Sequence, residues 1–473
     1  MSLPQPPPEA TYIFRGLAAQ IHSTQFIRGN TRLVTGDADG WIVLWGLASR
    51  RPTAVWRAHE AAILGVAEWG PDRLITHGKD NKLLVWKFSE EEEDSLSKTL
   101  PVEDPTTPRK QPWLLYVLNV NTLNFCPFGH CIAKQLPGQA STEVVSSSSN
   151  DELLIAVPNT LSSEAVRIPR IPPPITANIL QVDIFHLPSQ NRLATVPGDK
   201  STNTGMVMAV SILYLSSRLT LVVGYESGHT MVVQENPSVG WCRLYLSQPH
   251  SQPILSLAIT LNMASYITSG ADGIIAKHPL SSLSPPLAQP TQPQPRSNHQ
   301  KHPVKIPSAL SDTFAQSPSI PSAKPPRPQV KPEVVTKPLK VVQTKHSGQQ
   351  SLRIRSDGRI FATAGWDTKV RVYSVASMKE LAVLKWHKEG CFAVAFAEVI
   401  NVQEDKKGVD EGNVEKDKLE TEALEGGETA LAAPPRRVGL AISPKERRIQ
   451  QATQTHWVAA GSKDGKVSLW EIY

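Results

Sequence analysis

The sequence predicts an all-β fold in which seven four-stranded blades form one closed ring. The main observation is a spacing that recurs four times: an acidic residue, five residues, then an aromatic residue. Each copy lies between two strand-like apolar runs, as in the inner hairpin of a WD40-type β-propeller blade. The four copies are Asp39–Trp45, Asp80–Trp86, Asp367–Tyr373 and Asp464–Trp470.

Composition supports this fold and limits the possible functions. The 473 residues include 11 Trp, more than the 10 Phe or 8 Tyr, which suits a fold that repeats a Trp at the end of a strand. The 40 Pro are too many for seven compact blades, so they predict disordered insertions. The net charge of +6 is modest and scattered, so direct nucleic-acid binding is not expected.

Cysteine usage and hydropathy indicate a reducing compartment and no membrane partner. Four Cys do not make a disulfide framework in a chain of this length. No apolar run reaches about 18 residues, the length that predicts a membrane span. The N-terminus, MSLPQPPPEATY, lacks the basic and apolar regions of a secretory signal.

A hydrogen-bonded tetrad defines the blades more sharply. It consists of a His before the first strand, a Ser or Thr in the second, the turn Asp and the Trp of the third. The predicted structural members are His59, Thr76, Asp80 and Trp86 in blade two; Thr35, Asp39 and Trp45 in blade one; His346, Thr363, Asp367 and Tyr373 in blade six; and His387, Asp464 and Trp470 in blade seven. Ala460 stands at the hydroxyl position of blade seven.

Blades three to five are expected from strand alternation. Residues 113–128 should hold the last strand of blade two and the first of blade three, and 152–158, 181–187 and 192–197 should complete blade three. Blade four carries Ser227 and Val233 in place of Asp and Trp. Blade five begins at His250 and has His278 at the aromatic position.

The predicted domain organisation is a disordered segment, residues 1–10, followed by one propeller over 11–473. Blade seven receives only three strands from the C-terminal part, so residues 11–17 should supply the fourth and close the ring, which removes open sheet edges. Four segments are too long and polar for hairpin loops and are interpreted as solvated insertions that bury nothing. They are 89–111, 129–151, 281–336 and 401–435.

Residues 27–66 and DRLITHGKDNKLLVW (72–86) resemble the ASTRA-associated WD-repeat family of fungi and its animal Gβ-like relative. THGKDNKLLVW is the most specific piece, and NTLNFCPF and FATAGWDTKVRVY are also similar. The resemblance covers all seven blades but not the insertions. Lys79 stands where the family pattern leads us to expect Arg, which keeps the charge without the planar fork.

This resemblance implies a non-enzymatic scaffold subunit of the ASTRA complex, involved in chromatin remodelling and in maturation of phosphatidylinositol-3-kinase-related kinases. The implied partners are a kinase-related protein, co-chaperone subunits and AAA+ ATPase subunits, with this chain monomeric within the complex. The implied location is the nucleus, with the cytoplasm as the alternative. The rival hypothesis is a Gβ-like or ubiquitin-ligase substrate adaptor that binds peptides in the propeller channel, with Arg353 and Arg371 as candidate residues.

Four residues are candidates for binding partners. His77 and Lys79 replace the small residues usual in that turn, and either form a contact patch or reflect family drift with His77 bonded inside the sheet. Trp41 and Trp366 lie beside the turn Asp, and either anchor an interface or pack between blades. The acidic run Glu90–Asp94 is solvated surface or a dock for a basic partner.

No catalytic residue, metal or cofactor is expected. His59, Thr76 and Asp80 have the chemistry of a triad, but repetition of the same set favours a structural tetrad. The chain lacks a Gly-rich phosphate loop, an HExxH motif and a nucleophile elbow. Cys126, His130 and Cys131 offer only three of the four ligands that a structural zinc site needs.

Overall fold

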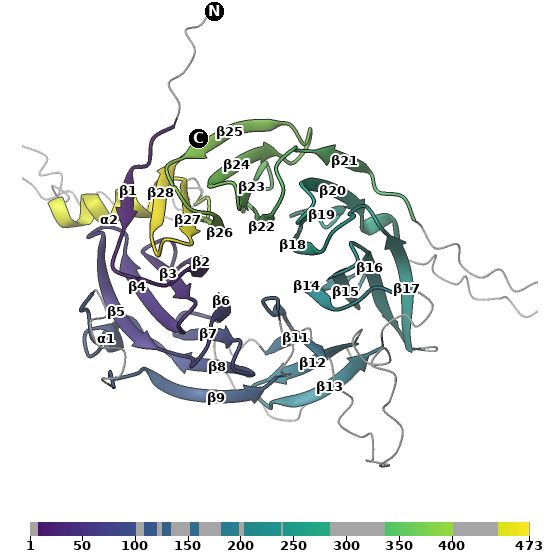
Figure 1. Cartoon of the computed structure of the whole chain (residues 1–473). Coiled ribbons are helices and arrows are strands. Elements are labelled where there is room, and N and C mark those ends of the chain that lie inside the picture. Colours follow the sequence, from purple (N-terminus) through teal and green to yellow (C-terminus); the bar gives the residue numbers. More distant parts are fainter. Residues whose placement is uncertain are drawn as a thin grey trace, which may run out of the picture.

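The computed structural model describes residues 8–100, 108–120, 125–133, 152–159, 181–197, 203–237, 240–283, 336–400 and 443–472. These residues form seven four-stranded antiparallel sheets arranged in a ring (Figure 1). The predicted seven-bladed propeller is therefore confirmed. Among the residues that the structure describes, no helix has the length and apolar character needed to cross a membrane.

The strands follow one another from the inside of each blade to its outside. Blade one contains β2 (Ile21–Ile27), β3 (Arg32–Asp37), β4 (Trp41–Gly46) and β5 (Arg51–Arg57). Blade two contains β6 (Ile63–Glu68), β7 (Arg73–Gly78), β8 (Lys82–Lys87) and β9 (Trp113–Asn119). Blade three contains β10 (Gly129–Ile132), β11 (Leu153–Asn159), β12 (Gln181–Leu187) and β13 (Asn191–Val196).

The same order continues around the ring. Blade four contains β14 (Val207–Leu215), β15 (Arg218–Tyr225), β16 (Thr230–Asn236) and β17 (Gly240–Ser247). Blade five contains β18 (Ile254–Ile259), β19 (Ser265–Gly270), β20 (Ile274–Pro279) and β21 (Lys340–Gln343). Blade six contains β22 (Gln349–Ile354), β23 (Ile360–Gly365), β24 (Lys369–Ser374) and β25 (Glu380–Lys385). Blade seven contains β26 (Cys391–Phe396), β27 (Trp457–Ser462), β28 (Val467–Glu471) and β1 (Tyr12–Phe14).

The N-terminal strand closes the ring as predicted. β1 pairs antiparallel with β28, with Tyr12 opposite Leu469 and Phe14 opposite Val467 (Figure 1). The Phe14 side chain is buried and its ring lies 4.9 Å from that of Trp45 in blade one. The strand therefore belongs to blade seven by hydrogen bonding and contributes to the core shared with blade one.

Apolar cores fill the space between neighbouring blades. Between blades one and two, for example, Trp56 and Trp86 meet edge to face with their ring centroids 6.4 Å apart. Alternation in each strand turns one set of side chains toward the preceding blade and the other toward the following blade. This explains why many strands of the middle positions are buried on both faces.

The first strand of blade three is displaced from its predicted position. We expected it within residues 113–128, but it is β10, which begins the segment interpreted as the insertion 129–151. A Cβ built on Gly129 would lie 3.0 Å from the Cα of Ser211 in blade four, so a larger residue would require the neighbouring strand to shift. Residues 134–151 lie outside the described part of the chain.

The segment 89–111 also differs from the expectation that it buries nothing. It begins with the short helix α1 (Glu90–Glu93), and Leu96 joins the core between blades one and two. A second helix, α2 (Pro444–Gln454), precedes β27 and was not predicted. Apart from 281–283 and 336, the insertions 281–336 and 401–435 lie outside the described residues, as do residues 1–7.

Candidate functional site

Blade two assembles its whole tetrad in the interior. His59 Nε2 lies 2.8 Å from Thr76 Oγ1, His59 Nδ1 lies 2.9 Å from Asp80 Oδ1, and Trp86 Nε1 donates to Thr76 Oγ1 at 2.9 Å. Burial opposes ionisation of Asp80, but the hydrogen bond and charge of His59 outweigh it and lower the pKa of Asp80. Because the Thr76 hydroxyl is fully buried, this set ties strands together and has no access to a substrate.

Blade five has an equivalent network that sequence reasoning missed. His250 bonds Asp272 at 3.0 Å and Thr268 at 2.9 Å, and Thr268 lies 3.0 Å from His278 Nε2. His278 replaces the Trp and uses its second nitrogen, Nδ1, to reach the Tyr245 hydroxyl of blade four at 2.9 Å. The spacing could have revealed it, since the His–Thr and His–Asp separations are 18 and 22 residues, against 17 and 21 in blade two.

Blade seven keeps its network by moving the hydroxyl to another strand. Ser468 Oγ lies 2.8 Å from His387 Nε2 and accepts from Trp470 Nε1 at 2.8 Å. Ser468 on β28 is the direct register partner of Ala460 on β27, the position where the hydroxyl was expected. His387 Nδ1 lies 3.8 Å from Asp464 Oδ1. The hydroxyl group of blade seven therefore comes from β28, the neighbour of the strand on which it was expected, and still reaches His387 and Trp470.

Blade one holds its carboxylate two residues earlier than expected. Trp45 Nε1 donates to Thr35 Oγ1 at 3.0 Å, but Asp39 is exposed. The buried acid is Asp37, which accepts the backbone N–H groups of Asp39 and Trp41 at 3.0 and 2.8 Å. Burial raises the pKa of Asp37 to about 6 despite these bonds.

Asp37→Asn is expected to stabilise the protein at neutral pH but not near pH 4. The folded pKa of Asp37 lies above its unfolded value, so its contribution to stability is present below about pH 4 and is lost as the pH rises through about 6. Asn keeps an acceptor for the backbone without ionising, which should gain roughly 1–3 kcal/mol at pH 7.5. Urea unfolding at pH 4.5, 6 and 7.5 measures the difference, and Asp39→Asn is the exposed control. If the stabilisation by Asp37→Asn does not increase with pH, the raised pKa of Asp37 is contradicted.

Blade six does not assemble the predicted tetrad. Arg371 takes the Asp367 carboxylate through two bonds of 3.0 and 2.6 Å, while His346 Nδ1 stays 3.5 Å away. The Tyr373 ring stacks on Phe361 with centroids 5.0 Å apart, and Thr363 is buried. Arg371 is thus committed inside the blade and cannot serve as the channel residue that the rival hypothesis required.

Two of the four candidate partner-binding residues are buried. Trp41 lies under Arg109, whose guanidinium carbon is 5.2 Å from the ring centroid. His77 is 0% exposed and packs edge to face against Phe128 in blade three. Burial lowers the pKa of His77 to about 3, so it is neutral at physiological pH. For Trp41, the alternative of packing between blades therefore describes the structure. His77 is likewise enclosed, by contact with Phe128, so it does not form an exposed contact patch.

Lys79 and Trp366 are exposed on loops between the second and third strands. Lys79 Nζ lies 5.1 Å from the ring centroid of Phe125, which is itself exposed. Trp366 donates from Nε1 to Gln350 Oε1 at 3.0 Å and remains 45% exposed. These two side chains are available to a partner.

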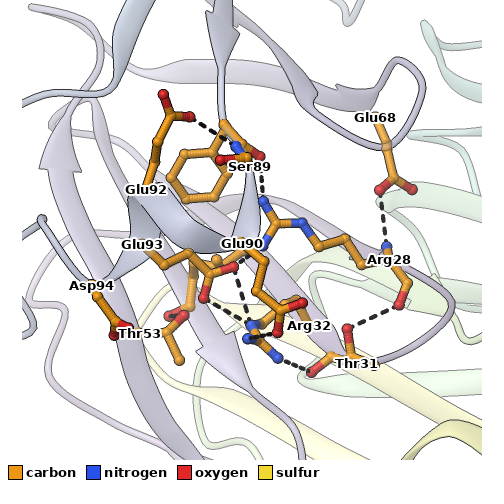
Figure 2. A network of polar contacts seen from close by, with 12 residues as sticks. Arg28, Thr31, Arg32, Thr53, Glu68, Ser89, Glu90, Glu92, Glu93 and Asp94 are labelled. Atoms are coloured by element: carbon orange, nitrogen blue, oxygen red, sulfur yellow. Dashed lines mark hydrogen bonds and ion pairs between the residues drawn. The ribbon is translucent and has the colours of Figure 1, made fainter.

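The acidic run binds basic residues of its own chain. Glu93 is 3% exposed and pairs with Arg28 and Arg32, both from blade one (Figure 2). Arg32 also reaches Glu90 at 2.9 Å, and the backbone N–H of Arg28 donates to Glu68 of blade two. The two interpretations of this run as solvated surface or as a dock for a foreign partner are therefore wrong for Glu93. Its counter-charges come from a turn that is distant in sequence.

Cys126 precedes β10, whereas His130 and Cys131 lie on that strand. Cys126 is fully buried, which raises the pKa of its thiol to about 12. Within the described part of the chain, no three His, Cys, Asp or Glu side chains gather in a way that could hold a metal ion.

Comparison with known proteins identifies close relatives along the whole chain. A model of the family described as ASTRA-associated protein 1 matches residues 10–470. The chain is 44% identical to ASTRA-associated protein 1 of Pyricularia oryzae, over 100% of this chain and 98% of that protein. It is 42% identical to that of Verticillium alfalfae, over 100% and 94%, and 29% identical to that of Schizosaccharomyces pombe, over 84% and 95%.

Proposed function

Because the chain belongs to the ASTRA-associated protein 1 family, we propose that it is a non-enzymatic scaffold subunit of an ASTRA complex. In this proposal it acts in chromatin remodelling and in the maturation of phosphatidylinositol-3-kinase-related kinases, in the nucleus. It contributes one copy that holds a kinase-related protein, co-chaperone subunits and AAA+ ATPase subunits together. A closed ring of sheets supports this role, because it offers two faces and an outer wall on one rigid body.

The observation that carries the proposal is the set of exposed apolar side chains on the outer strands of several blades. Trp113 on β9 is 71% exposed, with Leu114 and Val117 of the same strand each 41% exposed. Leu193 on β13 is 56% exposed and Leu381 on β25 is 58% exposed. Exposed Trp residues are frequent anchors of protein interfaces. Their distribution over different blades suits simultaneous binding of different partners.

The wall around Trp113 also contains basic side chains. A groove beside β9 is lined by Leu114, Val117, Arg57, Lys82 and Arg109, among others. Arg57 and Arg109 lie at its border with blade one, where Arg109 donates to the carbonyl oxygen of Thr99 at 2.9 Å. Glu60 and Asp80 line the same groove, so it carries charges of both signs beside its apolar residues and suits a protein partner with apolar and charged residues.

Trp113→Ala is expected to remove one set of partners and to leave the others bound. Truncating an exposed anchor at the centre of an interface typically costs about 2 kcal/mol or more, which is roughly a 30-fold loss of affinity. The measurement is affinity purification of the tagged full-length protein from its own cells at moderate salt, with quantitative mass spectrometry. Leu261→Ala is the control, because Leu261 is a 67% exposed apolar side chain between β18 and β19 of blade five that has no proposed role in binding.

The outcomes separate the proposal from its rival. Recovery of kinase-related, co-chaperone and AAA+ ATPase subunits with the wild-type chain supports an ASTRA scaffold. Recovery of cullin-type ligase subunits or G-protein partners in their place would refute it and favour a substrate adaptor. Identical recovery with wild type and Trp113→Ala would leave ASTRA membership intact but would exclude β9 as a binding surface.

A further inference from the structure

The axis of the ring contains two connected cavities. The larger, about 410 Å³, is lined by residues of the first strands, including Thr24, His130, Ser256 and Arg353. The smaller, about 80 Å³, shares Thr24, Ser256 and Arg353 with it and also reaches Phe125 and Phe392. Arg353 on β22 therefore stands where the channel narrows toward one mouth. We call the smaller cavity the mouth site.

Arg353 has no counter-charge among the described residues. Its Nη1 donates to the carbonyl oxygen of the adjacent Leu352 at 3.1 Å, and no carboxylate of the described chain forms an ion pair with it. By contrast, Arg32, Arg355 and Arg371 each pair with a carboxylate at 2.6–2.9 Å. Arg353 is an exposed residue on the channel wall, so its guanidinium is hydrated and accessible to an incoming anion. The surrounding wall still removes part of that water, which lowers the pKa of Arg353.

The lining of the mouth site suits an anion. It contains the hydroxyl groups of Thr24, Ser256 and Ser351 and the amide of Gln350, and no carboxylate. Thr24 is 5% exposed and its hydroxyl has no hydrogen-bond partner among the described residues. One acidic residue, Glu398, lines the larger cavity. It follows the C-terminal end of β26, whereas Phe392 lies near the N-terminal end of that strand. Negative charge is thus kept away from the mouth site.

The rim adds apolar and positive groups. The Phe392 ring stacks on His22 with centroids 5.7 Å apart, and Phe125 lies under the Lys79 ammonium group. Burial, and then the charge of Lys79, lower the pKa of His22. A segment entering the mouth would meet aromatic faces and positive charge before it reached Arg353.

We propose that the mouth site receives one anionic side chain of a partner polypeptide, held by Arg353, while flanking apolar residues pack on Phe125 and Phe392. The inference rests on the proposed function only in that a protein partner supplies the anion. A carboxylate or a phosphate monoester can accept two parallel N–H bonds from a guanidinium. The cavity of about 80 Å³ has room for one small anionic group.

The first test uses three peptides and the purified full-length chain. Acetyl-Gly-Leu-X-Leu-Gly-amide is prepared with X as Glu, phosphoserine or Gln, and binding is measured by isothermal titration calorimetry. We expect the Glu or the phosphoserine peptide to bind at least tenfold more tightly than the Gln peptide, and Arg353→Gln to abolish that difference. Preference between Glu and phosphoserine identifies the source of the anion. Equal binding of all three peptides, no binding to the wild type, or unchanged binding by Arg353→Gln would overturn the inference.

The second test separates a ligand-binding arginine from a structural one. Arg353→Met should not lower the midpoint of thermal unfolding, because it removes an uncompensated charge, whereas loss of a structural arginine would lower it. Inorganic phosphate should raise the midpoint of the wild type above that in NaCl of equal ionic strength, and should not do so for Arg353→Met. Arg359→Gln is the control, since its side chain lies on the same blade and is 83% exposed.

The outcomes of the peptide and phosphate experiments do not depend on the scaffold proposal. A phosphate effect that persists in Arg353→Met indicates an adventitious ion only and overturns the assignment of the mouth site. A lower unfolding midpoint for Arg353→Met also overturns it. Both experiments use the isolated protein, so their failure leaves the co-purification of ASTRA subunits untouched, and failure of that co-purification leaves the peptide preference intact.

Discussion

Phe14→Ala is expected to lower the free energy of unfolding by about 3–5 kcal/mol, the usual cost of emptying a buried Phe position. Phe14 is 1% exposed and contacts Trp45 of blade one, while its backbone pairs with Val467 of blade seven. The loss therefore falls on the one blade that is made from both ends of the chain. Weakening it exposes the edge of β28 and the core between blades seven and one.

Urea unfolding followed by tryptophan fluorescence measures this effect, with Leu193→Ala as the control. Leu193 is exposed on the outer strand of blade three, so its truncation should change stability by no more than about 0.5 kcal/mol. Hydrogen exchange should quicken first at the Thr11 N–H, which donates to the Leu469 carbonyl oxygen at 2.8 Å. If Phe14→Ala behaves like Leu193→Ala, β1 does not hold the ring closed.

Glu93→Gln is expected to cost about 3 kcal/mol, because it leaves two enclosed arginines without their shared carboxylate. The side chains of Arg28 and Arg32 are only 10% and 16% exposed, and both reach Glu93 (Figure 2). Without this charge, the exposed Glu90 is left to hold α1 to Arg32 of blade one, and Leu96 loses part of its support in the core. Glu91 lies on the same helix and is exposed, so Glu91→Gln is the matched control.

A double-mutant cycle with Arg32→Met makes this test specific. If Glu93 acts through Arg32, the double variant should be less destabilised than the sum of the two single variants by at least 1 kcal/mol or so. Chemical denaturation at pH 7 and 50 mM salt provides the four free energies of unfolding. If the effects are additive, or if Glu93→Gln is as stable as Glu91→Gln, the ion pairs of Glu93 do not stabilise the packing of α1 on blade one.

Local pattern was sufficient for most of the fold. The Asp-to-aromatic spacing, strand alternation and turn residues predicted the hairpins of blades one, two, six and seven, and the shortage of one strand predicted closure by residues 11–17. These features succeed because hairpin register depends on residues close in sequence. The prediction was weakest at blade three, where the inner strand β10 is short and its Gly129 lies close to the backbone of blade four.

The candidate site was less predictable because its decisive contacts join distant segments. Trp41 and His77 carry the residue types of an interface, yet Arg109 and Phe128 cover them. Asp367 has the expected spacing, yet Arg371 takes its carboxylate. Ser468 and His278 show that a hydrogen-bond network tolerates a change of residue if another side chain reaches the same point. A one-dimensional motif does not contain that information.

Hydrophobic periodicity and the number of strands in the amino-acid sequence were enough to predict how many blades the protein has, their order and the strand that closes the ring. Which charged and aromatic side chains are paired, covered or exposed became known only from the folded chain. Folding paired Glu93 with Arg28 and Arg32, buried Trp41 and, among the described residues, left Arg353 without an ion-paired carboxylate. The physical reason is that compensation of a charge and burial of a ring depend on neighbours brought together by folding, often from other blades.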